Sequence, residues 1–120
     1  MARARYEQAL PVYQEIGDRL GEANCQLGLG DVAKGEKSWD QAGQFYQTAL
    51  AAYRDIGIPI NTGLALRRLG TVTEAKGEPA AAISYYREAL QIFETIGVKD
   101  AAYTREDLQR VQEKITGEQP

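Results

Sequence analysis

The feature that most constrains this chain is a repeat of 40 residues that runs along most of its 120 residues. Five kinds of position carry the same residue in all three copies, and a sixth carries an aromatic ring each time. The matching sets are Tyr6, Tyr46 and Tyr86; Ala9, Ala49 and Ala89; Leu10, Leu50 and Leu90; Ile16, Ile56 and Ile96; Gly17, Gly57 and Gly97; and the ring-bearing Tyr13, Tyr53 and Phe93. Five identical triplets in one register predict that the chain consists of copies of one structural unit.

Within each copy the apolar residues recur with the period of an α-helix. Over residues 39–56 they form one wide stripe, which is made up of Ala42, Phe45, Tyr46, Ala49, Leu50, Tyr53 and Ile56. Gly57 follows the stripe, and glycine in this place is typical of a left-handed helix end. We also predict a capping box between Ser38 and Gln41, and we place Pro79 in the first turn of a helix.

The pattern predicts six helices, near residues 2–16, 19–36, 39–56, 60–76, 79–96 and 100–115. The connections between them are short, which favours antiparallel hairpins. Glycine recurs inside the second and fourth of these helices, in the pairs Leu29-Gly30 and Leu69-Gly70. A glycine in a helix interior costs about 1 kcal/mol relative to alanine. We therefore predict that a packed partner helix approaches the backbone closely at both glycines.

Composition and charge exclude several classes of function. The net charge is −3 with acids and bases interspersed, so no basic stripe is available for a nucleic acid. No apolar run approaches the roughly 18 residues typical of a membrane span, and no apolar stretch follows the N-terminal arginines as in a secretory signal. We expect a cytoplasmic protein. Its single cysteine, Cys25, cannot form an internal disulfide and is expected to be a small buried packing residue.

The sequence offers no set of residues for catalysis. It contains no histidine, the most common general base and metal ligand, and its glycines do not form a phosphate-binding loop. No nucleophile–base pair and no cluster of metal ligands can be assembled from the remaining residues. We therefore predict a protein without enzymatic activity, catalytic residues, bound metal or cofactor.

The repeat resembles the tetratricopeptide repeat family, in its bacterial-type variant of roughly 40 residues per unit. The residues that carry the match are Leu29-Gly30, Ala42, Tyr46 and Ala49, then Leu69-Gly70, Ala82, Tyr86 and Ala89, with Tyr6 and Ala9 in the first copy. The resemblance implies an all-α, right-handed superhelical solenoid of antiparallel helix hairpins. It also implies a scaffold for protein–protein interaction. Bacterial relatives often sit beside signalling or nucleotide-binding domains, so the chain could equally be a fragment of a larger signalling protein.

The repeat boundaries divide the chain into units near 1–20, 21–60 and 61–100, with a capping helix at 100–115. Together they form one repeat domain over residues 1–116, and residues 117–120 are expected to fray. The last helix has Gln109-Arg110 in place of Leu-Gly and a polar outer face, which is typical of a solenoid cap. The first helix has an apolar stripe and no such cap. Self-association as a homodimer through that stripe is the alternative function, and its candidate residues are Tyr6, Leu10, Tyr13 and Ile16.

The resemblance further implies that the first helix of each pair lines a concave groove for a peptide. By position, the groove residues are Asn24, Leu27, Asp31 and Lys34, then Leu64, Arg67, Thr71 and Glu74, with Thr104, Asp107 and Lys114 as an extension. Arg67 alone fits a clamp for a terminal carboxylate, so we expect an extended peptide or a helix as the ligand. The alternative, that these side chains only solvate a helix face, stays open. Tyr85 and Tyr103 lie outside the repeated core positions and are candidates for a stacking surface.

Overall fold

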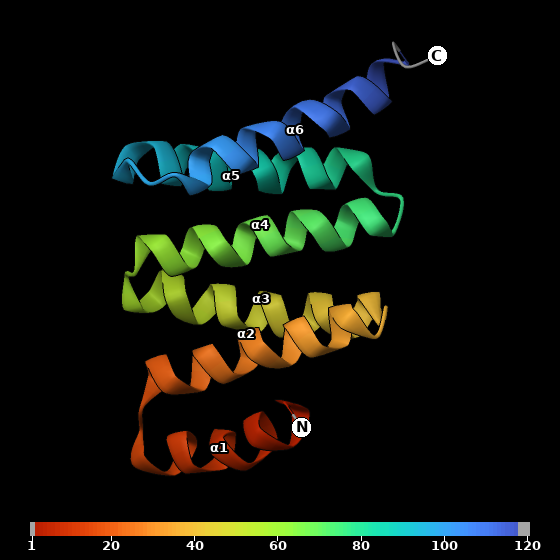
Figure 1. Ribbon diagram of the computed structural model, residues 1–120. Coiled ribbons are helices and arrows are strands. Elements are labelled where there is room, and N and C mark those ends of the chain that lie inside the picture. The colour runs from red at the N-terminus through yellow and green to blue at the C-terminus, as the bar shows by residue number, and fades with distance from the viewer. Residues whose placement is uncertain (1, 118–120) are drawn as a thin grey trace. The chain divides into compact units, whose positions relative to one another are not determined.

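The computed structural model describes residues 2–117, which form six α-helices joined by short turns (Figure 1). The helices are α1 (Ala2–Ile16), α2 (Arg19–Gly35), α3 (Trp39–Ile56), α4 (Pro59–Ala75), α5 (Pro79–Ile96) and α6 (Asp100–Thr116). The prediction of an all-α fold is confirmed. Each observed helix end lies within one residue of its predicted position.

The chain divides into two compact units, residues 1–58 and residues 59–120. In the first unit α2 packs against both α1 and α3, and in the second unit α5 packs against both α4 and α6. Successive helices within each unit run in opposite directions, as the predicted hairpins require (Figure 1). Gly117 ends α6 with a φ of 70°. The rest of the predicted frayed tail, residues 118–120, lies outside the described residues.

Glycine ends the second helix of each hairpin. Gly57 and Gly97 have φ angles of 85° and 84°, a left-handed conformation that suits glycine because it lacks a Cβ. Their amides donate to the carbonyls of Tyr53 and Phe93 at 2.8 and 2.9 Å. The predicted left-handed end at Gly57 is thus confirmed, as is the place of Pro79 in the first turn of α5.

The predicted capping box at the start of α3 is wrong. Ser38 occupies the N-cap position, but its side chain makes no capping hydrogen bond. The Ser38 amide already donates to the Ala33 carbonyl at 2.9 Å, so it is not free to pair with the Gln41 side chain. A side-chain cap occurs instead at the start of α2, where the Asp18 carboxylate accepts a hydrogen bond from the Gly21 amide at 2.8 Å.

The core of each unit is built where tyrosine rings of the second hairpin helix lie against glycines of the first. Tyr46 and Tyr86 are fully buried. A Cβ placed on Gly30 would lie 2.5 Å from the ring of Tyr46, and one placed on Gly70 would lie 2.5 Å from the ring of Tyr86. The close approach predicted at these two glycines is confirmed, although the approaching group is a ring and not a backbone.

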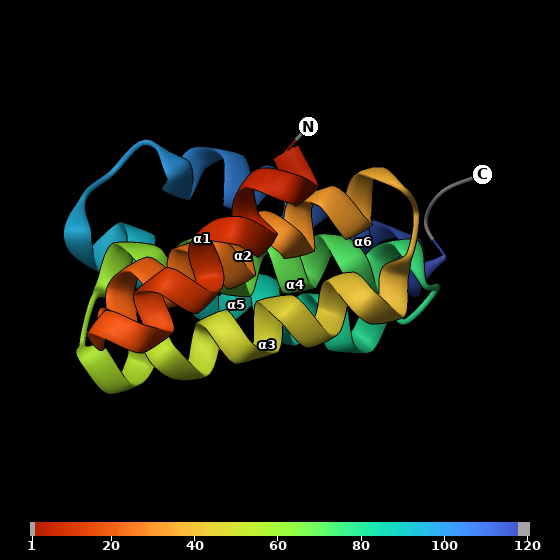
Figure 2. The same cartoon turned by 90° about the horizontal axis from the view of Figure 1, so that it is seen from below.

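Helix α1 lies against α2, as Figure 2 shows. It contains no fully buried residue. The rings of Tyr6 and Tyr13 lie against Gly28 and Gly21 of α2. Tyr6 is therefore half-buried, whereas Tyr46, its equivalent one repeat later, is fully buried. The repeat keeps the same ring at this position, but the first copy has less protein around it.

Candidate functional site

The candidate surface lies on the first helices of the hairpins, and the two units are described separately. In the first unit we call it the α2 face, which consists of Asn24, Leu27, Asp31 and Lys34. In the second unit we call it the α4–α6 face, which consists of Leu64, Arg67, Thr71, Glu74, Tyr103, Asp107, Arg110 and Lys114. Both definitions start from the groove residues that the sequence predicts.

Two polar residues of the α2 face are hydrogen-bonded to tyrosines of the core. The hydroxyl of Tyr53 donates to Asn24 Oδ1 at 2.6 Å, and the hydroxyl of Tyr46 donates to Asp31 Oδ1 at 2.5 Å. The hydroxyl group of each ring thus binds a polar side chain of the α2 face. Lys34 is half-buried and makes no ion pair among residues 2–117. It is therefore the charge of this face that is open to a ligand.

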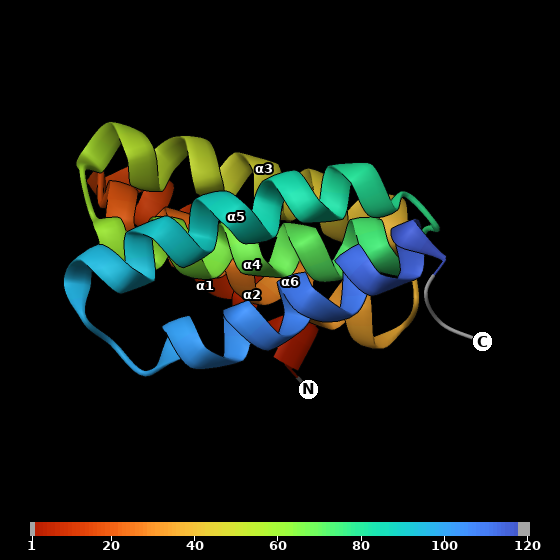
Figure 3. The ribbon, with the colours of Figure 1, turned by 90° about the horizontal axis from the view of Figure 1, so that it is seen from above.

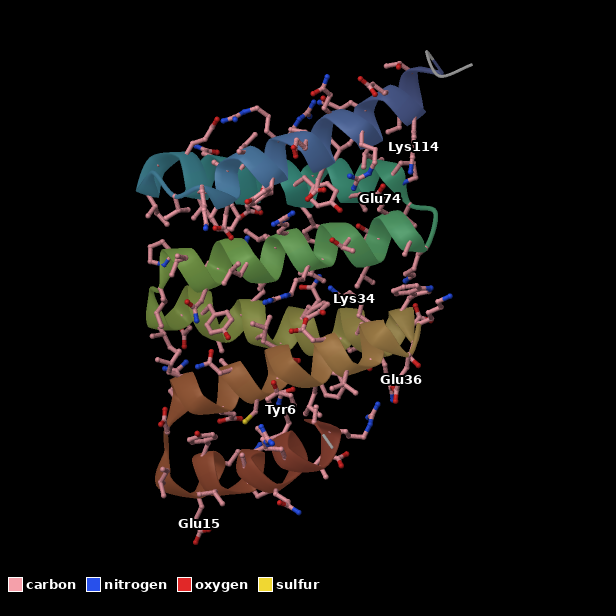
Figure 4. All side chains as sticks on the ribbon, in the orientation of Figure 1. Tyr6, Glu15, Lys34, Glu36, Glu74 and Lys114 are labelled. Carbon is pink, nitrogen blue, oxygen red and sulfur yellow. The ribbon has the colours of Figure 1, made fainter. Side chains whose placement is uncertain are left out.

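Ion pairs across the α4–α6 face join the two helices. Arg67 Nε donates to Asp107 Oδ2 at 2.8 Å, while the Arg110 guanidinium donates to both Glu74 carboxylate oxygens, at 2.8 and 3.0 Å. Lys114 Nζ adds a contact of 3.2 Å to Glu74, and the two side chains face each other in Figure 4. Within the second unit, α6 is the helix nearest the viewer in Figure 3, and these ion pairs join it to α4.

Glu74 is the centre of this network. Its side chain is 16% exposed, and it also accepts a hydrogen bond from the Tyr86 hydroxyl at 3.0 Å. The hydrogen bond from Arg110 lowers the pKa of Glu74 to about 2, and the bonds from Tyr86 and Lys114 act in the same direction against the effect of burial. Burial raises the pKa of Tyr86, so its phenol keeps the proton that it donates. Glu74 is therefore a charged structural acceptor at neutral pH.

Tyr103 is the large exposed aromatic residue of the α4–α6 face. Its side chain is 50% exposed, and the Arg67 guanidinium lies 5.8 Å from the centre of its ring, within the range of a cation–π interaction. Arg67 is fixed from the other side by Asp107. The ring is thus presented to solvent by a side chain that is itself held in place.

The structure changes the assignment of two residues that the sequence singled out. Thr104, predicted to extend the groove, is fully buried and its hydroxyl donates to the Asp100 carbonyl at 2.8 Å, so that prediction is wrong. Arg110, interpreted as part of a polar cap, is the main partner of Glu74. Opposite charges at equivalent positions of successive repeats, as at 67/107 and 74/114, are the sequence signal that could have identified this network.

Other candidates are placed as follows. Among the self-association residues, Tyr6 and Tyr13 pack against α2, Leu10 is half-buried, and Ile16 is 68% exposed.

Cys25 is buried as predicted, and burial raises the pKa of its thiol, which disfavours the reactive thiolate. Residues 2–117 contain no group of three or more His, Cys, Asp or Glu side chains placed to hold a metal ion. No helix in that range combines the length and apolar character needed to cross a membrane.

Comparison with known proteins identifies the repeat. A sequence model described as tetratricopeptide repeat matches residues 1–55 and 35–95. The chain belongs to the tetratricopeptide repeat family. Members of this family generally act as non-catalytic protein-interaction repeats. No curated protein matches the sequence.

Two solved structures show the same fold. The apo form of RapI is similar over 96% of this chain and 42% of its own, with a TM-score of 0.90 and 17% sequence identity. BtubC (BKLC) from P. vanneervenii is similar over 91% of this chain and 46% of its own, with a TM-score of 0.84 and 21% identity. At these identities the likeness concerns the fold. The chain spans less than half the length of either structure.

Proposed function

We propose that this tetratricopeptide repeat chain is a non-catalytic interaction module that binds an extended peptide or a helix of a partner protein on its α4–α6 face. Family membership supports the general role. The observation that carries the specific proposal is Tyr103, a half-exposed ring held by Arg67 on a surface whose charges are already paired. A pre-organised ring loses little side-chain freedom when a ligand covers it.

The chemistry of the α4–α6 face indicates which ligand it fits. Tyrosine and arginine are enriched among the residues that dominate binding energy at interfaces. Arg110 and Lys114 are 48% and 57% exposed, and the face carries three basic groups against two acidic ones. We expect a ligand segment with an apolar side chain against Tyr103 and with carboxylate or carbonyl oxygens toward the exposed basic groups.

The α2 face is proposed as a separate, weaker contact for the same class of ligand. Leu27 is half-buried and offers apolar surface, while Lys34 has a charge that no side chain of residues 2–117 neutralises. Asn24 and Asp31 accept hydrogen bonds from core tyrosines, so their remaining lone pairs are what they can offer a ligand.

A library of random displayed peptides, selected on the full chain, tests the α4–α6 face. Selected peptides should bind the Tyr103→Ala variant at least about 10-fold more weakly, a loss of about 1.4 kcal/mol. Ile115→Ala is the matched control, since Ile115 is 49% exposed on the same helix but lies outside this face. Fluorescence polarisation measures both affinities. Equal binding by Tyr103→Ala and the unmodified chain would show that the ligand does not use this face.

Self-association is the second candidate function, and the exposure of α1 favours it. Val12 is 54% and Ile16 is 68% exposed, and an apolar patch of this kind marks an interaction surface. That the chain forms part of a larger signalling protein is a further proposal. The fraction of RapI that the chain covers, 42%, supports the greater length and not the signalling role.

A further inference from the structure

A small pocket lies between α2 and α3 of the first unit. Its volume is about 200 Å³, and it is lined by Arg19, Glu22, Ala23, Gln26, Thr48 and Ala52. Glu22 and Gln26 precede Leu27 and Asp31 of the α2 face by five residues, which places them about 140° away around the helix. The pocket therefore opens on a different side of α2 from the α2 face.

The pocket offers three oxygen atoms that can accept hydrogen bonds. The half-buried Glu22 carboxylate accepts one long hydrogen bond, at 3.3 Å from the amide of Gln14. The Thr48 hydroxyl donates to the Gln44 carbonyl at 3.0 Å, so the lone pairs of its oxygen stay available. Gln26 is half-buried and makes no side-chain hydrogen bond among residues 2–117, so it can present its amide oxygen to a ligand.

The charge of Glu22 is not balanced inside the pocket. Arg19 is the basic residue of the lining, but its guanidinium is paired with the carboxylate of Asp55. These two charges cancel, and Glu22 makes no ion pair among residues 2–117. The positive end of the α2 dipole has its own carboxylate, because Asp18 caps the first turn of the helix. The pocket therefore attracts a cation.

The packing of the hairpin does not require this polar lining. One repeat later, Thr62 stands in place of Glu22, and the fully buried Leu66 stands in place of Gln26. Ile92 likewise takes the place of Ala52. The second hairpin thus packs with other residues at these three positions. The small and polar residues are a property of the first unit.

We propose that this pocket binds the side chain of a lysine from a partner polypeptide. Small-molecule sites have volumes of about 300–1,000 Å³, and a smaller pocket suits a single side chain. The methylene groups of the lysine would lie on Ala23 and Ala52, while its ammonium group donates to Glu22, Gln26 and Thr48. An ammonium group turns its three donors toward separate acceptors, whereas the flat guanidinium of arginine suits one paired carboxylate.

The surface beside the pocket has room for the rest of the partner. A wider depression of about 660 Å³ shares Arg19 and Ala52 with the pocket, and its other lining residues are Ala51, Arg54 and Asp55. The alanine side chains are short, so a partner backbone can lie close to α3 there. This site goes beyond the proposed function, because it adds a contact of different chemistry on another surface of the chain.

Titration of the isotope-labelled full chain with the peptide acetyl-Gly-Ala-Lys-Ala-Gly-amide, followed by nuclear magnetic resonance, tests the pocket. One side chain buries little area, so we expect a Kd of about 1 mM and saturable shifts of the Glu22, Gln26 and Thr48 amide signals. A norleucine peptide keeps the four-carbon chain without the ammonium group and should bind at least about 10-fold more weakly. The arginine peptide should also bind more weakly.

Three results of this titration would each overturn the proposal. They are an absence of saturable shifts at the pocket, equal binding of the norleucine peptide, and tighter binding of the arginine peptide. The first would show that the pocket is empty of ligand, the second that it is only apolar, and the third that its carboxylate binds a guanidinium.

Variants of the chain test the same site from the protein side. Glu22→Gln removes the unbalanced charge and should weaken binding of the lysine peptide at least about 10-fold. Ala52→Ile introduces the residue of the second hairpin and should abolish binding by filling the pocket without a change of charge. Glu7→Gln, the control, removes an exposed carboxylate of α1 outside the pocket and should bind as the unmodified chain does. Far-UV circular dichroism checks that each variant keeps its helices.

The outcome is independent of the α4–α6 face. Tyr103→Ala should bind the lysine peptide with unchanged affinity, even where it loses the ligands of that face. Loss of the lysine peptide in Tyr103→Ala would place the peptide on the α4–α6 face and overturn the assignment to the pocket. Unchanged affinity in both Glu22→Gln and Ala52→Ile would overturn it as well.

Discussion

At the scale of single residues, Gly70 allows a test of the packing between tyrosine rings and glycines. A Cβ at this position would lie 2.5 Å from Cε1 of Tyr86, whose side chain is fully buried. We predict that Gly70→Ala lowers the free energy of unfolding by about 1–3 kcal/mol, because the cost of overpacking exceeds the gain of about 1 kcal/mol in helix propensity. Urea unfolding followed by far-UV circular dichroism measures the change.

Gly35→Ala is the control for this prediction. Gly35 is the last residue of α2, and a Cβ there would meet nothing within 4 Å. Its replacement should leave the free energy of unfolding unchanged or raise it by less than about 1 kcal/mol. If Gly70→Ala were as stable as Gly35→Ala, the ring of Tyr86 would not be packed as described.

Glu74 predicts a pH dependence of stability. Its pKa is lowered in the folded chain from 4.5 to about 2, so its contribution to stability is fully present above about pH 4.5 and is lost as the pH falls toward 2. We predict that Glu74→Gln lowers the free energy of unfolding at neutral pH by about 1–3 kcal/mol, since Arg110 and Lys114 lose their shared acceptor. The variant should also show a weaker loss of stability between about pH 4.5 and 2.

Urea unfolding at neutral pH and at several points through the acid range tests this. The matched control is Glu106→Gln, which removes an exposed carboxylate of α6 that makes no ion pair among residues 2–117. The control should keep the stability and the acid dependence of the unmodified chain. The role assigned to Glu74 is refuted by a Glu74→Gln variant whose acid dependence equals that of the unmodified chain.

Residue positions could be predicted from the sequence, but the bonds that their side chains make could not. The period of the apolar stripe placed Asn24, Asp31 and Glu74 on one face of their helices, because it depends on local geometry alone. The tyrosine hydroxyls that reach them come from another helix, and whether a buried ring ends on a carboxylate depends on rotamers that a repeat pattern does not encode. The same dependence explains why Ser38 matches the sequence signature of a capping box although its side chain does not make the capping hydrogen bond.

At the scale of helices, the start of α2 is expected to depend on Asp18. Its carboxylate accepts a hydrogen bond from the Gly21 amide at 2.8 Å and satisfies a donor that has no partner within the helix. We predict that Asp18→Ala lowers the free energy of unfolding by about 1 kcal/mol. Ser38→Ala, at the N-cap of α3 without a capping bond, should change it by less than about 0.5 kcal/mol. Urea unfolding compares the two, and an equal effect would argue against a specific cap at Asp18.

The helices themselves could be predicted to within one residue because their ends carry local signals, such as Gly57 and Pro79. The attachment of α6 to α4 could not be predicted in this way. It depends on ion pairs between long side chains of residues that lie 36 to 40 positions apart in the sequence. The charges of Arg67 and Asp107 are visible in the sequence. Their pairing across two helices depends on the packing of α5 and α6, which brings both side chains to the same face.

At the scale of the whole chain, the two units differ in the helix that packs beside the hairpin. This helix is α1 in the first unit and α6 in the second. Helix α6 of the second unit has three buried residues and ion pairs to α4, and its outer side is polar. Helix α1 of the first unit has no fully buried residue and exposes Val12 and Ile16. The same repeat thus ends in a solvated helix in one unit and in an apolar surface in the other, which is why ligand binding and self-association are assigned to different units.

This difference predicts an order of local opening that hydrogen exchange measured by mass spectrometry can follow. At low protein concentration the amides of α1 should exchange fastest among the six helices, because few buried contacts hold it and Pro11 removes one of its backbone hydrogen bonds. The amides of α3 and α5, which carry the buried rings, should exchange slowest. Protection of α1 that already equals that of α5 would contradict the burial described here.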